Sequence, residues 1–189
     1  MSTTPAPSGF GPTALATPAN AVTIGRVVAM PVLIAMILHG GSTWPAVIFW
    51  FLVSCTDGVD GWLARRHGTT RSGAFLDPLA DKVVVLAAMV ALVATGDFWW
   101  VPVMVIAARE IGLIAFRTSA SRRGVSIPAR STAKLKTVVQ DLAIGAALLP
   151  PLQGHPRVAD TLLWCAVVLT VFTGGQYVLD GRKATTHAM

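Results

Sequence analysis

The chain has 189 residues, of which 53% are hydrophobic and only 13% are charged, and its mean hydropathy is +0.63. A soluble domain of this length cannot bury so much apolar surface, so the composition excludes an ordinary globular protein and indicates an integral membrane protein. The net charge of +6 lies in basic segments without interleaved aromatic residues. We therefore expect anionic lipid and phosphorylated substrates as partners, and no nucleic acid.

Six apolar segments predict an all-α bundle of six transmembrane helices within residues 20–180, between a flexible N-terminal tail (1–19) and a C-terminal tail (181–189). In chain order, the first span covers about 21–38. The second starts near Trp44 and is apolar through Cys55, and the third is apolar over 83–95. The fourth ends near Phe116, and the last two cover about 133–149 and 158–179.

The basic residues between these spans predict the orientation of the bundle. The segments 65–72 and 117–136 hold most of the lysines and arginines, whereas the alternate connections, 39–45, 95–98 and 150–158, hold only Arg157. Because basic connections stay on the cytoplasmic side, we expect a multi-pass protein of the cell (inner or plasma) membrane with both termini in the cytoplasm.

The stretch from Asp57 to Lys82 places four aspartates between two apolar runs. On a helix, one stripe would contain Asp57, Asp60, Gly61, Ala64 and Arg65, and a second stripe would contain Gly73, Asp77 and Asp81. A short basic turn joins the two helices, so we expect them to be antiparallel neighbours with facing stripes. Ionisable residues at this depth face the bundle interior, which predicts a polar chamber, and the active site, at the cytoplasmic side.

Four facing carboxylates cannot all stay ionised in a low-dielectric site without a positive partner. Oxygen ligands without neighbouring His or Cys suit Mg²⁺, Mn²⁺ or Ca²⁺, and Arg65 suits a bound phosphate. Metal, arginine and polyanion together are the apparatus of phosphoryl transfer. The alternative is a structural packing cluster, in which the aspartates pair with Arg65, Arg66, Arg71 and Lys82. The regular spacing of four aspartates, with small residues between them, disfavours this alternative.

At these residues the sequence resembles the CDP-alcohol phosphotransferases. Their signature has Asp, two residues, Asp-Gly, two residues, Ala-Arg, a gap of seven or eight, then Gly, Asp and Asp, each separated by three residues. This chain matches every fixed position from Asp57 to Asp81. Looser segments resemble the phosphatidylglycerophosphate synthases of this family, namely NAVTIGR (20–26), GAFLDPLADK (73–82), AREIGLIAFR (108–117) and KLKTVVQ (134–140).

The resemblance implies transfer of a phosphatidyl group from CDP-diacylglycerol to an alcohol, with release of CMP. One or two Mg²⁺ or Mn²⁺ ions would be bound by Asp57, Asp60, Asp77 and Asp81, and Asp81 would also be the general base. The CDP moiety would be bound by Asp60, Gly61, Ala64, Arg65 and Gly73, with Asn20 and Thr23 near the chamber mouth. Members of the family commonly form homodimers, which the resemblance implies here too.

The looser segments favour glycerol 3-phosphate as the acceptor, with phosphatidylglycerophosphate as the product. Its phosphate needs cations of its own, and the candidates are Arg109, Arg117, Lys134 and Lys136. Inositol phosphate, or phosphatidylglycerol as in a cardiolipin synthase, remains an alternative acceptor because the signature reads only the donor. The sequence assigns no role to Asp141 or to the sixth helix.

A divalent-cation transporter is the alternative from a different class. It would need polar residues across the whole membrane, but the outward halves of the spans are nearly free of charge, with Asp97, Arg157 and Asp160 at or near their ends.

Overall fold

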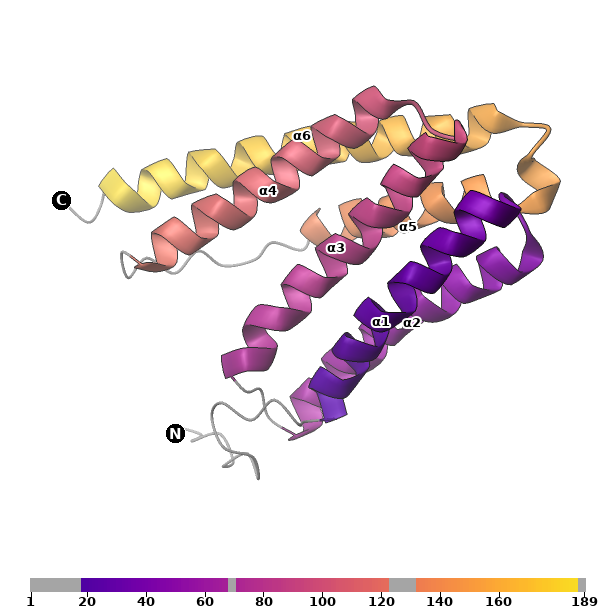
Figure 1. Cartoon of the computed structure of the whole chain (residues 1–189). Coiled ribbons are helices and arrows are strands. Elements are labelled where there is room, and N and C mark those ends of the chain that lie inside the picture. Colours follow the sequence, from indigo (N-terminus) through magenta and orange to yellow (C-terminus); the bar gives the residue numbers. More distant parts are fainter. Residues whose placement is uncertain (1–17, 68–70, 123–131, 187–189) are drawn as a thin grey trace.

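The structure is a computed structural model that describes residues 18–67, 71–122 and 132–186, and the side chains of 24–56, 82–115 and 135–176. These residues form α-helices and one short 3₁₀ helix, without a β-strand, which confirms the all-α prediction (Figure 1). The elements are α1 (Pro18–Gly40), α2 (Trp44–His67), α3 (Arg71–Thr95), α4 (Trp100–Arg122), α5 (Thr132–Leu148), η1 (Pro150–Leu152) and α6 (Pro156–Thr186).

Several helices extend beyond the apolar segments that predicted them. Helix α4 continues to Arg122 and α6 to Thr186, past the predicted ends near 116 and 179. The predicted polar connection 117–136 is therefore shorter, because α5 already begins at Thr132. A hydropathy pattern identifies only the apolar part of a helix. Lysine, arginine and alanine also favour helix formation, so the helices extend into polar segments and the pattern underestimated their length.

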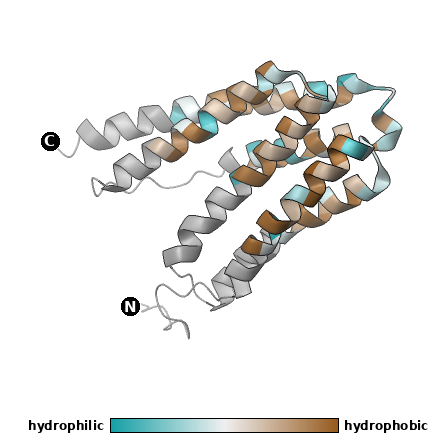
Figure 2. Cartoon of the chain, viewed as in Figure 1, coloured by the Kyte–Doolittle hydropathy of each residue, from teal (hydrophilic) through white to brown (hydrophobic). Residues whose placement is uncertain are grey.

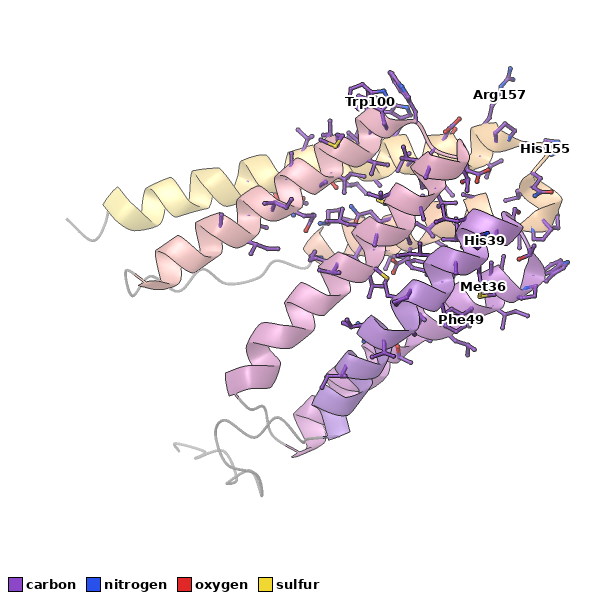
Figure 3. All side chains as sticks on the ribbon, in the orientation of Figure 1. Met36, His39, Phe49, Trp100, His155 and Arg157 are labelled. Carbon is purple, nitrogen blue, oxygen red and sulfur yellow. The ribbon has the colours of Figure 1, made fainter. Side chains whose placement is uncertain are left out.

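Successive helices run in alternating directions, so the described ends of the chain, in α1 and α6, lie at the same end of the bundle (Figure 1). His39, Trp100, His155 and Arg157 lie at the opposite end (Figure 3). Turns there use glycine in the left-handed region, with φ of +61° at Gly41 and +85° at Gly96, where other residues would be strained. The hydroxyl of Ser42 donates to the Leu148 carbonyl at 2.9 Å and ties the α1–α2 turn to α5.

Hydrophobic residues predominate along the described helices (Figure 2), and they occur both in the interior and on the outside of the bundle. Helix α1 packs on α2 and α3, and α6 packs on α4 and α5. Fully buried members of the core are Leu33, Ile37, Met89, Leu92, Ile106, Ile144, Leu148 and Leu163. Large exposed apolar residues include Val28, Val32, Phe51, Leu52, Met104, Val168, Val171 and Phe172. Such an outer surface suits lipid rather than water.

One described helix is long and apolar enough to cross a membrane by length and composition, over Pro156–Gln176. Ile24–Gly40, Trp44–Thr56 and Lys82–Thr95 are shorter apolar helical stretches. Helices α2 and α3 thus each combine an apolar part with a polar part that contains half of the signature.

Two leucines of α5 separate the interior from the outer surface. Leu148 is fully buried and Leu142 is 55% exposed. We expect Leu148→Ala to lower the unfolding free energy by about 2–5 kcal/mol through the cavity it leaves, and Leu142→Ala to change it by less than about 0.5 kcal/mol. Thermal unfolding in detergent measures both. Equal losses would contradict the assignment of the two faces.

Candidate functional site

The signature residues lie on two helices. Asp57, Asp60, Gly61, Ala64 and Arg65 belong to α2, and Gly73, Asp77 and Asp81 belong to α3. The backbone is helical through both halves, as the i, i+3 and i+4 spacings require. The side chains of these residues, and those of Asn20, Thr23, Arg117 and Lys134, lie outside the described part, so the facing of the two stripes stays a prediction.

The described side chains contain a charged cluster inside the bundle, formed by Lys82, Arg109, Glu110 and Lys136, which we call the Glu110 cluster. Its members come from α3, α4 and α5. Glu110 is 2% exposed and Lys136 is 1% exposed. The Glu110 carboxylate accepts from Lys136 Nζ and from Arg109 Nη1 at Oε1, the latter at 2.9 Å, and its Oε2 lies 3.6 Å from Lys82 Nζ. One carboxylate therefore joins cations from three helices.

Arg109 also contacts the sixth helix. Its Nη2 donates to Thr173 Oγ1 at 3.0 Å. Two of the four predicted acceptor-phosphate residues, Arg109 and Lys136, are thus brought together, although they are 27 positions apart in the sequence. Both lie inside the bundle, where Arg109 keeps 12% of its side chain exposed.

The Glu110 cluster offers donors that suit an anion. Arg109 and Lys136 contribute cationic N–H groups beside the Glu110 carboxylate, and Lys136 and Glu110 are almost completely buried. Charge-assisted donors of this kind suit a phosphate group. Among the side chains that the structure describes, no group of three His, Cys, Asp or Glu residues could hold a metal ion; the four signature aspartates are outside that set.

Two residues of this site were not predicted as ligand-binding residues. Lys82 follows Asp81 directly and was assigned only to the alternative packing cluster, and Thr173 lies on a helix without a recognised motif. The run TGGQ, 173–176, could have indicated Thr173, because it places polar and small residues inside an otherwise apolar span. Gln140, one turn after Lys136 in α5, is 2% exposed, and its Nε2 makes no hydrogen bond.

An apolar groove of about 550 Å³ reaches the Glu110 cluster at Lys82. Its walls come from α1, α3 and α4, and its lining includes Ile34, Leu38, Val83, Leu86, Val90 and Ile111. The groove is therefore apolar along its length and cationic where it meets the cluster, a combination that suits an amphiphilic molecule.

Comparison with known proteins gives a consistent result. Residues 16–172 match the family model described as CDP-alcohol phosphatidyltransferase. A protein of Mycobacterium tuberculosis (strain H37Rv) named "Probable phosphatidylglycerophosphate synthase" is 44% identical over 168 residues, covering 85% of this chain and 79% of that protein. Two further relatives are both named "CDP-diacylglycerol--glycerol-3-phosphate 3-phosphatidyltransferase". The protein of Bacillus subtilis (strain 168) is 34% identical, and the match covers 95% of its length. The protein of Rickettsia bellii (strain RML369-C) is 32% identical, and the match covers 94% of its length.

Neutralising Glu110 tests the electrostatic role of the cluster. We expect Glu110→Gln to lower the unfolding free energy by about 3–5 kcal/mol, because it leaves buried cations without their carboxylate. Adding Lys136→Met should recover part of that loss, since it removes one of the uncompensated charges. Thermal unfolding of the wild type, both single variants and the double variant forms a double-mutant cycle. Strictly additive losses would contradict the pairing.

Proposed function

This chain belongs to the CDP-alcohol phosphatidyltransferase family, and we propose that it transfers the phosphatidyl group of CDP-diacylglycerol to glycerol 3-phosphate. In this reaction a hydroxyl oxygen of glycerol 3-phosphate forms a bond to the phosphatidyl phosphorus. The bond from that phosphorus to the oxygen shared with the CMP phosphate breaks, and CMP leaves with the electron pair. The products are phosphatidylglycerophosphate and CMP.

Members of the family depend on divalent metal ions in general. The donor set here fits such ions, because Asp57, Asp60, Asp77 and Asp81 supply only carboxylate oxygens from two helical segments, and hard cations such as Mg²⁺ and Mn²⁺ prefer oxygen. We propose that these four residues hold one or two of them. When bound, the ions neutralise negative charge on the pyrophosphate of the donor.

The remaining signature residues orient the donor, and one of them accepts the proton. We propose that Asp60, Gly61, Ala64, Arg65 and Gly73, with Asn20 and Thr23 of α1, bind the CDP moiety. Asp81 takes the proton of the acceptor hydroxyl as that oxygen attacks phosphorus. The apolar groove, whose lining includes Lys82, supports a donor with both an apolar and an anionic part.

The Glu110 cluster is the observation that carries the choice of acceptor. Its arginine and lysine donors inside the bundle support an acceptor with a phosphate of its own, which Arg109 and Lys136 bind. Arg117, two turns after Arg109 in α4, and Lys134, near the start of α5, are proposed to assist. Lys82 follows the proposed base directly in α3, so the cluster lies next to the signature along the chain.

The exposed apolar surface and the alternating helices support a chain that crosses the membrane six times, with the signature, both termini and the basic connections in or near the cytoplasm. We also propose that the chain forms a homodimer and that its basic segments contact anionic lipid.

The acceptor assay is the direct test. Purified protein in detergent with CDP-diacylglycerol, Mg²⁺ and radiolabelled glycerol 3-phosphate should transfer label into lipid, and a chelator should abolish this transfer. We expect Asp81→Asn to lower kcat by roughly 10²–10⁴-fold, the usual contribution of a general base.

Parallel reactions with inositol 1-phosphate and phosphatidylglycerol separate the alternative acceptors. Transfer to one of these but not to glycerol 3-phosphate would overturn the acceptor and keep the reaction class. Failure with every acceptor, from folded protein supplied with metal, would overturn the proposed reaction.

Removing the guanidinium of Arg109 should affect the two substrates unequally. We expect Arg109→Gln to raise KM for glycerol 3-phosphate by about ten- to a hundredfold, as for a lost hydrogen bond between charged groups. The KM for CDP-diacylglycerol should change by less than about threefold. Steady-state kinetics with each substrate varied in turn measures both values, and a rise confined to the donor would contradict the assignment.

A further inference from the structure

Helix α6 holds Arg109 through a hydroxyl that is itself fixed. Thr173 Oγ1 donates to the carbonyl of Leu169 at 2.7 Å, one turn earlier in α6. The hydroxyl proton is thereby directed at the backbone, which leaves an oxygen lone pair for Arg109 Nη2 at 3.0 Å. Thr173 is 4% exposed, so this contact is shielded from water and is stronger than it would be at the surface.

The next residue, Gly174, lets the stem of Arg109 approach the backbone of α6. A Cβ atom at Gly174 would lie 3.3 Å from Arg109 Nε and 3.4 Å from its Cγ. The neighbouring Gly175 has nothing within 4 Å of the same position. A glycine inside a helix costs about 1 kcal/mol relative to alanine, and at Gly174 the close approach of the arginine gives a physical reason for it.

Two hydrogen bonds hold the guanidinium of the arginine, and the absence of a side chain at Gly174 leaves space for its stem. Glu110 accepts from Nη1 at 2.9 Å, and Thr173 accepts from Nη2. The Nε atom is buried and makes no hydrogen bond among the described residues, so a methyl group at position 174 would press on a part of the stem that no hydrogen bond fixes. Each Nη atom keeps a second N–H, and these two remain for a ligand.

We propose that Thr173 and Gly174 are positioning residues, which fix the guanidinium of Arg109 for the phosphate of the acceptor. This inference rests on the proposed function and extends it, because it gives α6 a role in acceptor recognition although α6 supplies no ligand itself. Small misplacements of a binding group are costly in an enzyme site, so displacement of the guanidinium by a few tenths of an ångström should weaken acceptor binding.

The test compares the two adjacent glycines. Gly174→Ala should raise KM for glycerol 3-phosphate roughly tenfold, whereas Gly175→Ala, which adds the same methyl group to the same helix, should leave it within about twofold. Both substitutions change helix propensity equally, so the pair removes that effect from the comparison. The KM for CDP-diacylglycerol should stay unchanged in both variants.

Two substitutions separate the effect of the shape of Thr173 from the effect of its hydroxyl group. Thr173→Val keeps the shape and removes the acceptor oxygen, and should raise the same KM roughly tenfold. Thr173→Ser keeps the hydroxyl and should restore it to within about threefold. Combining Gly174→Ala with Arg109→Gln should add no further increase beyond that of Arg109→Gln alone, because the glycine acts through the arginine.

The outcomes distinguish failure of the positioning role from failure of the proposed function. Wild-type transfer to glycerol 3-phosphate with equal KM values for Gly174→Ala and Gly175→Ala would overturn the positioning role and leave the proposed function in place. A full additional increase in the double variant would also overturn it. A wild type that transfers to no phosphorylated acceptor would overturn the proposed function, and the positioning role with it.

Discussion

The carboxylate of Glu110 is the interaction on which the arrangement of the site depends. It is almost completely buried and joins Lys82 of α3, Arg109 of its own helix and Lys136 of α5. Cations inside an apolar bundle would be prohibitively costly alone. Their shared partner makes burial possible and fixes three helices relative to one another at this point, so the same carboxylate that stabilises the bundle also brings together Arg109 and Lys136, the two residues proposed to bind the acceptor phosphate.

The apolar surroundings strengthen the electrostatic interactions of the Glu110 cluster. Large apolar side chains cover the outside of the bundle and others fill its core, so the cluster is screened weakly by solvent and its charges act strongly over short distances. Arg109 and Lys136 carry charged donors there. A phosphate would accept from such donors through negatively charged oxygens, whereas a neutral alcohol would be a weaker acceptor in the same place.

Much of the fold followed from the sequence because helices that enter a membrane have long apolar runs, and the predicted segments reappear as α1 to α6. Arg109 and Lys136 were named from the sequence as cations for the acceptor phosphate, and that role stays a prediction, although the structure brings the two residues together at Glu110. Thr173 and Gly174 could not be predicted, since neither residue is conspicuous and their partner lies more than 60 positions earlier in the chain. The facing of the aspartate stripes depends on side chains outside the described part and stays a prediction.

Binding of a phosphate does not require the cluster to come apart. Glu110 and Thr173 take one N–H from each Nη atom of Arg109, and a lysine ammonium has three donors, of which Lys136 directs one at Glu110. The remaining donors can reach a ligand while the existing contacts hold the side chains in place. A site that keeps its internal pairs loses little conformational entropy on binding. In the proposed site, the contacts of α6 with Arg109 would therefore contribute to the affinity for the acceptor without any atom of α6 touching it.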